Sequence, residues 1–124
     1  MKEETKNWLK QARKDLKKAT ILRERNQFDG VTFYAQQTAE KALKSVYIYQ
    51  KNDLLKTHDL SILGREVNLP NNLLEMAALL NPFYISSRYP LTIEDKNLPD
   101  EEDADNSIKY AREILKWCKQ QIKI

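Results

Sequence analysis

Several residue types are scarce in this sequence, and each shortage excludes a class of protein. Cys118 is the single cysteine, so no intramolecular disulfide can form, and with a single histidine a structural zinc site is not expected. Two glycines and four prolines in 124 residues favour a few long helices over many short strands. No run approaches the roughly 20 apolar residues of a membrane span, and the polar N-terminus lacks a signal-peptide core. We therefore expect a cytoplasmic protein without a membrane segment, a metal or a cofactor.

Length and charge are those of an ordinary globular protein. A chain of 124 residues with 41% hydrophobic and 31% charged residues can bury one core, so we expect a single domain spanning residues 1–124. Lys and Arg (21) exceed Asp and Glu (18), which gives a net charge of +3. That excess is compatible with an anionic partner. It falls short of the concentrated basic stripe of a dedicated nucleic-acid binder.

Hydrophobic periodicity predicts an all-α fold, because apolar residues recur at three- and four-residue steps. The expected main helices cover residues 3–25, 31–49, 73–87 and 101–122, and residues 89–98 are expected to form a loop. Gly30 is the expected break after the first helix, and Pro82 should kink or divide the third main helix. Thr57 or Asp59 should cap a short helix that ends near residue 67, and Asp100 should cap the last helix. The prediction is an up-and-down bundle of four main helices plus one short helix.

The second expected helix carries the most informative surface pattern. Ala35, Ala39 and Ala42 lie on its apolar face, so a neighbouring backbone can approach closely. Glu40 and Lys44 lie one turn apart with the acid first, the order that stabilises a helix.

His58 is where any acid–base hypothesis has to begin, because imidazole is the side chain that changes charge near neutral pH. A second interpretation is that Thr57-His58-Asp59 is a helix-capping turn whose imidazole hydrogen-bonds to a neighbour. The sequence leaves both interpretations open.

Basic and amide side chains are the next candidates. Lys41 and Lys44 lie within one turn, with Gln37 one turn before Lys41, and they form either a ridge facing an anionic ligand or the solvated side of an amphipathic helix. Arg88 lies where a helix gives way to a loop, because Pro90 biases the residue before it toward extended backbone. Its guanidinium can grip a phosphate through two hydrogen bonds, or tie the loop to carboxylates and carbonyls.

Aromatic residues complete the candidate site. Tyr84 and Tyr89 can stack on a base, although aromatic residues at helical spacing more often belong to the core or to a subunit contact. The acidic run at residues 100–105 lacks the glycine and the ligand spacing of a calcium loop. No phosphate-binding glycine loop, nucleophile elbow or metalloprotease helix occurs in the chain.

Four segments carry a family pattern in a fixed order. They are the W-x3-A-x2-DL pattern of Trp8, Ala12, Asp15 and Leu16, then Gln36-Gln37-Thr38-Ala39-Glu40-Lys41-Ala42-Leu43-Lys44, then Thr57-His58-Asp59-Leu60, and last Ser87-Arg88-Tyr89-Pro90. With these segments the chain resembles the HEPN family (higher eukaryotes and prokaryotes nucleotide-binding domain) over essentially its whole length.

The resemblance implies an up-and-down helical bundle that commonly forms a homodimer. Members are often encoded beside a small nucleotidyltransferase, with which they form toxin–antitoxin-like pairs. Others in the wider family are metal-independent ribonucleases, in which an Arg-x4–6-His motif from both subunits surrounds an RNA phosphate.

The ribonuclease motif is missing from this sequence. Lys51, Asn52 and Asp53 occupy the positions five to seven residues before His58, and no histidine follows Arg88. This departure favours a non-catalytic module that binds a nucleotide or an RNA phosphate and partners a nucleotidyltransferase. The expected ligand-binding residues, which the fold would have to gather into one electropositive patch, are Gln37, Lys41, Lys44, His58, Tyr84, Arg88 and Tyr89.

Two further functions remain open at this stage. The first is a metal-independent ribonuclease in which His58 acts as acid and base and Arg88 stabilises a charged phosphorane. The second is a purely structural dimerisation module without a small ligand, which the alanine-rich helix face and the number of aromatic residues favour.

Overall fold

The computed structural model describes residues 2–86 and 98–123. Within them the chain forms helices without strands: α1 (Lys2–Glu24), α2 (Phe28–Lys51), α3 (Leu60–Glu66), α4 (Asn71–Leu80), α5 (Pro82–Ser86) and α6 (Glu101–Gln121). The predicted all-α bundle is therefore confirmed.

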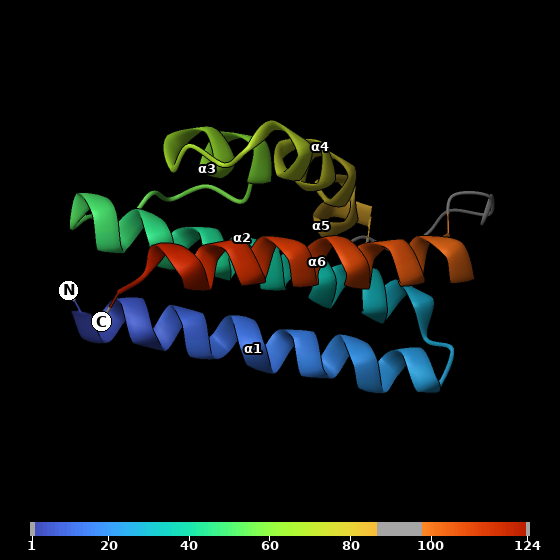
Figure 1. Cartoon of the computed structure of the whole chain (residues 1–124). Coiled ribbons are helices and arrows are strands. Elements are labelled where there is room, and N and C mark those ends of the chain that lie inside the picture. Colours follow the sequence, from blue (N-terminus) through green and yellow to red (C-terminus); the bar gives the residue numbers. More distant parts are fainter. Residues whose placement is uncertain (1, 87–97, 124) are drawn as a thin grey trace.

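The helices run up and down around a central α2. The long helices α1, α2 and α6 lie side by side, and α3, α4 and α5 cover α2 on the side away from α1 (Figure 1). Within the described residues α2 packs against each of the other helices, whereas α1 packs only against α2 and α6. Residues at the middle of α2 therefore have protein on several sides, and polar side chains there must find partners.

Local signals set most of the helix boundaries. Asp59 caps α3 and Asp100 caps α6, where Asp100 and Asp103 form a capping box. The predicted break at Pro82 is also found, because the segment expected as one helix ends as α4 before Asn81 and restarts as α5 at Pro82. The bundle thus has three long helices and a fourth side built from α3, α4 and α5.

The turn between α1 and α2 differs from the sequence expectation. Gly30 was expected to break the chain, but it lies inside the first turn of α2, and Asn26 adopts the left-handed backbone instead (φ 57°). Asparagine tolerates that conformation, so the turn needs no glycine. A Cβ atom at Gly30 would lie 2.8 Å from Cδ1 of Leu22, so the glycine permits close approach of α2 to α1.

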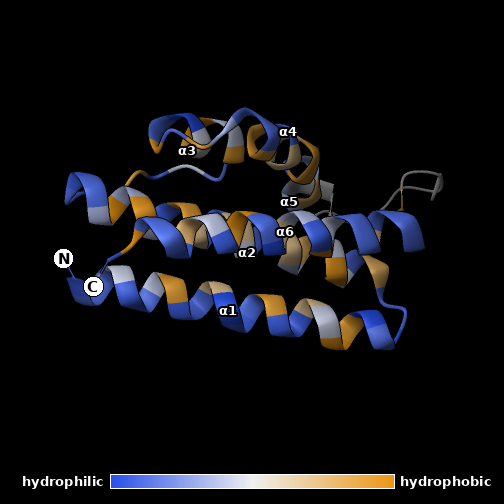
Figure 2. Ribbon diagram, viewed as in Figure 1, coloured by the Kyte–Doolittle hydropathy of each residue, from blue (hydrophilic) through white to orange (hydrophobic). Residues whose placement is uncertain are grey.

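The core lies along α2. Ala35, Ala39 and Ala42 are fully buried, as the alanine pattern predicted, and Leu43 and Val46 extend the same face. In Figure 2 hydrophobic and hydrophilic residues alternate along α1 and α6, as expected of helices with one buried side. Among the described residues, no helix combines the length and the apolar character needed to cross a bilayer.

Candidate functional site

A row of buried polar side chains follows one face of α2. Gln36, Glu40 and Lys44 are spaced four residues apart, so they stack one above the other along the helix. Their exposed fractions are 0%, 3% and 6%. A buried carboxylate and a buried ammonium need each other, and the structure pairs them, since Lys44 Nζ lies 3.1 Å from Glu40 Oε2.

Glu40 is the centre of this network. Its two carboxylate oxygens lie 3.1 and 3.0 Å from Nδ1 of His58, and Gln36 Nε2 lies 3.5 Å from Oε1. Gln36 also donates to the backbone carbonyl of His58 at 3.3 Å. The helix α2 therefore holds both the ring and the backbone of His58.

The other ring nitrogen of His58, Nε2, has no hydrogen bond within the described residues. An ionised carboxylate only accepts hydrogen bonds, so Nδ1 carries the hydrogen that points at Glu40, and in the neutral ring Nε2 keeps its lone pair. The side chain is 56% exposed, and no contact of Nε2 is found within the described residues. This nitrogen is positioned to accept from a ligand, or to donate to one once the ring is protonated.

Tyr84 covers one face of the imidazole. The two ring centroids are 4.4 Å apart with planes 16° from parallel, which is a stacked arrangement. The two rings line a pocket of about 410 Å³ together with Asp59, Asn81 and Pro82. The pocket thus joins aromatic surface to one unengaged nitrogen and to polar groups at the start of α3.

Asp59 and Asn81 fix the wall of this pocket. Asp59 accepts from the N–H groups of Ser61 (2.9 Å) and Ile62 (3.3 Å) and from the side-chain amide of Asn81 (2.9 Å). Asn81 Oδ1 in turn accepts from the N–H of Leu60 at 2.8 Å. The Asn81 amide, more than any other neighbour, holds the pKa of the Asp59 carboxyl below its ordinary value, because it stabilises the ionised form.

The other predicted site residues on α2 are engaged within the protein. Lys41 Nζ lies 2.6 Å from Oδ2 of Asp15, a carboxylate that is only 1% exposed. Gln37 donates to Oε1 of Gln36 at 2.7 Å, so it supports the network from its edge. The expected ridge of free positive charge is instead a pair of separate ion pairs, Lys41–Asp15 and Lys44–Glu40.

Five of the seven expected residues lie in the described part of the chain, and they fall into three groups. His58 and Tyr84 line the pocket, Lys44 and Gln37 reach it through Glu40 and Gln36, and Lys41 belongs to a different ion pair. Arg88 and Tyr89 lie outside the described residues.

Sequence reasoning missed three contributors: Glu40, Gln36 and Asn81. Glu40 and Gln36 belong to the second family segment, and the four-residue spacing of Gln36, Glu40 and Lys44 is the signal that could have identified them. Asn81 had one signal, its position directly before the helix-breaking Pro82.

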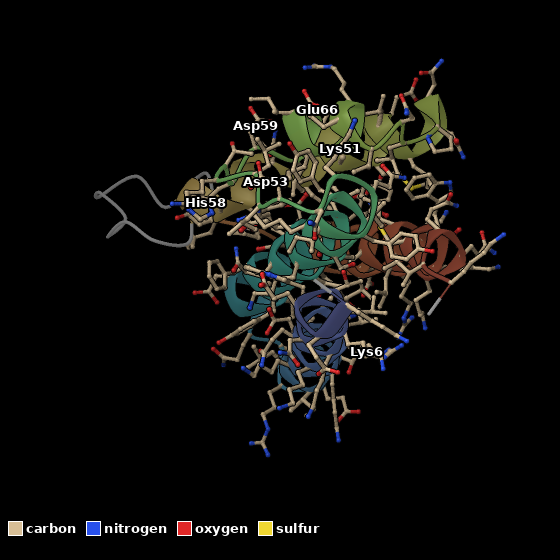
Figure 3. All side chains as sticks on the ribbon, turned by 90° about the vertical axis from the view of Figure 1, so that its left-hand side faces the viewer. Lys6, Lys51, Asp53, His58, Asp59 and Glu66 are labelled. Carbon is tan, nitrogen blue, oxygen red and sulfur yellow. The ribbon has the colours of Figure 1, made fainter. Side chains whose placement is uncertain are left out.

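Across residues 2–86 and 98–123, no group of three or more His, Cys, Asp or Glu side chains is arranged to hold an ion. Figure 3 shows His58 and Asp59 beside each other on the α3 side of the bundle, apart from Lys6 at α1.

Comparisons with known proteins place these residues in a family context. The model of the HEPN domain family matches residues 5–121. The crystal structure of TT1696 from Thermus thermophilus is similar, with 25% identity, a TM-score of 0.84 and coverage of 95% of this chain and 98% of that one. That of ST0689, described as an archaeal HEPN homologue, has 32% identity, a TM-score of 0.82 and coverage of 96% and 98%. No curated protein matches the chain.

Proposed function

Because this chain belongs to the HEPN domain family, we propose that residues 1–124 form one helical module that binds a nucleotide or an RNA phosphate at the His58 pocket. The observation that supports the proposal is the arrangement of His58. Its Nδ1 is held by buried Glu40, its face is stacked on Tyr84, and its side chain lines a pocket of about 410 Å³. Small-molecule sites commonly combine apolar or aromatic walls with a few placed polar groups.

Charge at the pocket favours an anion when the imidazole is protonated. Glu40 and Lys44 form an ion pair, so a proton on His58 adds one positive charge to a pocket whose other charged lining residue is Asp59, and the Asp59 carboxylate is already held by Asn81 and two backbone N–H groups. Both ring nitrogens then donate, Nδ1 to Glu40 and Nε2 to the ligand.

Residues near the pocket have different parts in the proposal. Tyr84 offers a ring face to a base, and Lys44 forms an ion pair with the Glu40 carboxylate that orients His58. Arg88 and Tyr89 follow Tyr84 closely in sequence and are proposed as phosphate and base contacts. Gln37 contributes from the edge of the network through Gln36, whereas Lys41, which is paired with Asp15, is proposed to act from outside the network.

Calorimetric titration with adenosine monophosphate, adenosine triphosphate and a short RNA tests the pocket. We expect His58→Ala and Arg88→Ala to weaken binding at least about tenfold, since a hydrogen bond to a charged group contributes roughly 1.5–3 kcal/mol. Lys56→Ala is the matched control, because Lys56 is exposed and lies two residues from His58 outside the pocket lining. Equal affinity of the His58→Ala variant and the wild type would show that the pocket assignment is wrong.

We also propose that the module forms a homodimer in the cytoplasm and partners a small nucleotidyltransferase in a toxin–antitoxin-like pair. Family membership supports this proposal, since HEPN domains often dimerise. Light scattering at micromolar concentration tests the dimer. Co-purification with the product of an adjacent nucleotidyltransferase gene tests the partner, and a monomeric protein without such a gene beside it would contradict both parts.

The Glu40–His58 pair favours a second candidate, a metal-independent ribonuclease. A carboxylate that fixes one imidazole nitrogen leaves the other to take a proton from an attacking hydroxyl and return it to a leaving oxygen. Arg88 would stabilise the charged phosphorane. This candidate predicts RNA cleavage in EDTA that is lost in His58→Ala and strongly reduced in Glu40→Gln, and binding without such cleavage would leave the non-catalytic function.

A further inference from the structure

The seam between α1 and α6 is lined by positive charge. These helices pack against each other and run in opposite directions (Figure 1). Two hollows lie along the seam, one of about 470 Å³ beside Arg23 and Arg112 and one of about 580 Å³ beside Lys6 and Lys119. Neither hollow contains a residue of the His58 pocket.

The larger hollow is cationic on both sides. Its polar lining consists of Lys6, Lys10 and Arg13 from α1 and Lys119 near the end of α6, and its apolar part is Leu9 and Ile122. No carboxylate lines it, and none of the four cations has an ion pair or hydrogen bond within the described residues. Four uncompensated cations around one hollow mark a site for an anion.

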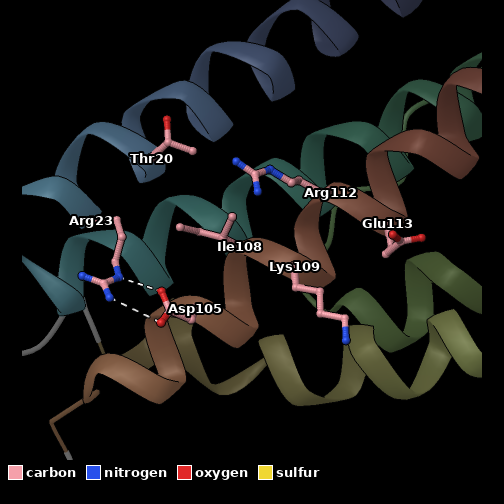
Figure 4. A pocket seen from close by; sticks show the side chains of 7 residues that line it. All are labelled: Thr20, Arg23, Asp105, Ile108, Lys109, Arg112 and Glu113. Carbon is pink, nitrogen blue, oxygen red and sulfur yellow. Dashed lines mark hydrogen bonds and ion pairs between the residues drawn. The ribbon is translucent and has the colours of Figure 1, made fainter.

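The smaller hollow adds a further free cation. Arg23 is bound there by Asp105 and Glu101, each at 2.6 Å, and the hydrogen bond to Asp105 raises the pKa of Arg23. Asp105, which lines this hollow, is therefore occupied by Arg23, and the formal charges of two other charged lining residues, Lys109 and Glu113, cancel. Figure 4 shows the Arg112 side chain extending from α6 toward α1, and no partner for it is found in the described part of the chain.

Both helices continue this pattern as stripes of basic residues at three- and four-residue spacing. The stripe on α1 consists of Lys6, Lys10, Arg13 and Lys17, and the stripe near the end of α6 consists of Arg112, Lys116 and Lys119. Side chains at this spacing share one helix face, and like charges there oppose helix formation. The net charge of +3 did not indicate a concentrated basic surface. Such a surface arises here because two helices, each with a row of basic residues, pack side by side.

We propose that this α1/α6 seam binds the phosphodiester backbone of a nucleic acid strand. The helix rises about 16 Å between Lys6 and Lys17, which suits a linear polyanion better than a single phosphate. No aromatic residue lines either hollow, so the bases would not be read and binding would be independent of sequence. The proposal stands on residues outside the His58 pocket and does not depend on the proposed function.

Apolar surface argues against a membrane as the occupant. A helix that lies on a bilayer buries a row of large hydrophobic side chains. The large hydrophobic residues exposed in the described part of the chain are Ile21, Tyr49, Ile62, Leu79 and Leu98, and none lines the seam.

Fluorescence anisotropy with a labelled single-stranded RNA of mixed sequence, at several salt concentrations, tests the seam. The variant is Lys6→Gln/Lys119→Gln, which removes one charge from each side, and the control Arg25→Gln/Lys51→Gln removes two charges elsewhere. We expect the seam variant to bind about tenfold more weakly and to lower the slope of log affinity against log salt by about 1.4, since each single-strand phosphate contact contributes about 0.7. The control should change affinity less than about twofold, and Lys6→Arg/Lys119→Arg should bind as the wild type does.

Three results would overturn the proposal. The first is a loss of RNA affinity that is equal in the seam variant and its control. The second is an RNA affinity of the seam variant equal to that of the wild type. The third is tighter binding of the protein to vesicles of anionic phospholipid than to RNA. His58→Ala separates the two sites, because it should leave the salt slope unchanged. If His58→Ala abolishes RNA binding and the seam variant does not, the proposal for the seam is wrong and the proposal for the His58 pocket is supported.

Discussion

At the scale of single residues, Glu40 is the residue on which the geometry of the candidate site depends most. It is 3% exposed, yet it accepts from His58, Lys44 and Gln36. Lys44 is further enclosed by Trp8, whose ring centroid lies 5.4 Å from Nζ. The site can therefore be disturbed from inside the protein without altering any residue that lines the pocket.

Glu40→Gln should destabilise the protein by about 3 kcal/mol, because it leaves the buried Lys44 ammonium without its countercharge. The free energy of unfolding from urea denaturation measures the effect. Glu66→Gln, which removes an exposed carboxylate from α3, should change it by less than about 0.5 kcal/mol. Glu40→Gln/Lys44→Met should recover part of the loss, and a Glu40→Gln variant as stable as Glu66→Gln would contradict the pairing.

At the scale of helices, local chemistry was enough to predict most boundaries. Asp59, Pro82 and Asp100 act on neighbouring backbone, so their effects could be predicted from adjacent residues. The prediction of a break at Gly30 was wrong because a glycine can occur either in a turn or at a close contact between helices. The contact with Leu22 depends on how α1 and α2 meet, which local sequence does not contain.

Asp59→Ala should destabilise the protein by about 1 kcal/mol at neutral pH, because α3 loses its cap and Asn81 loses an acceptor. The folded pKa of Asp59 is lowered, so its contribution is full above the ordinary carboxyl pKa and is lost as the pH falls through the folded pKa. The difference from the wild type should therefore shrink in acid. Urea denaturation at several pH values checks this, with Glu75→Ala as an exposed control, and a constant difference down to strongly acidic pH would contradict it.

At the scale of the whole molecule, the family segments meet one another in space. Asp15 of the first segment pairs with Lys41 of the second, Trp8 of the first covers Lys44 of the second, and Glu40 holds His58 of the third. The resemblance predicted the bundle correctly from these segments. The pairings join residues 18 or more positions apart, so helical periodicity could not show that Lys41 is paired with Asp15 or that Glu40 holds His58.

The α1/α6 seam also arises only at this scale. Each basic stripe alone has the pattern of a solvated helix face, and only antiparallel packing gives their charges a common hollow. The molecule therefore has two separate candidate surfaces, a pocket built around one imidazole and a seam built from rows of cations.

The central claim is that Glu40 orients His58 so that Nε2 serves the ligand. Because the chain has one histidine, an NMR spectrum correlating imidazole nitrogens with ring protons reports this residue alone. In the neutral ring we predict hydrogen on Nδ1 and a lone pair on Nε2, with the Nε2 signal shifting on titration with adenosine monophosphate. Hydrogen on Nε2, together with a spectrum that saturating nucleotide leaves unchanged, would contradict the account.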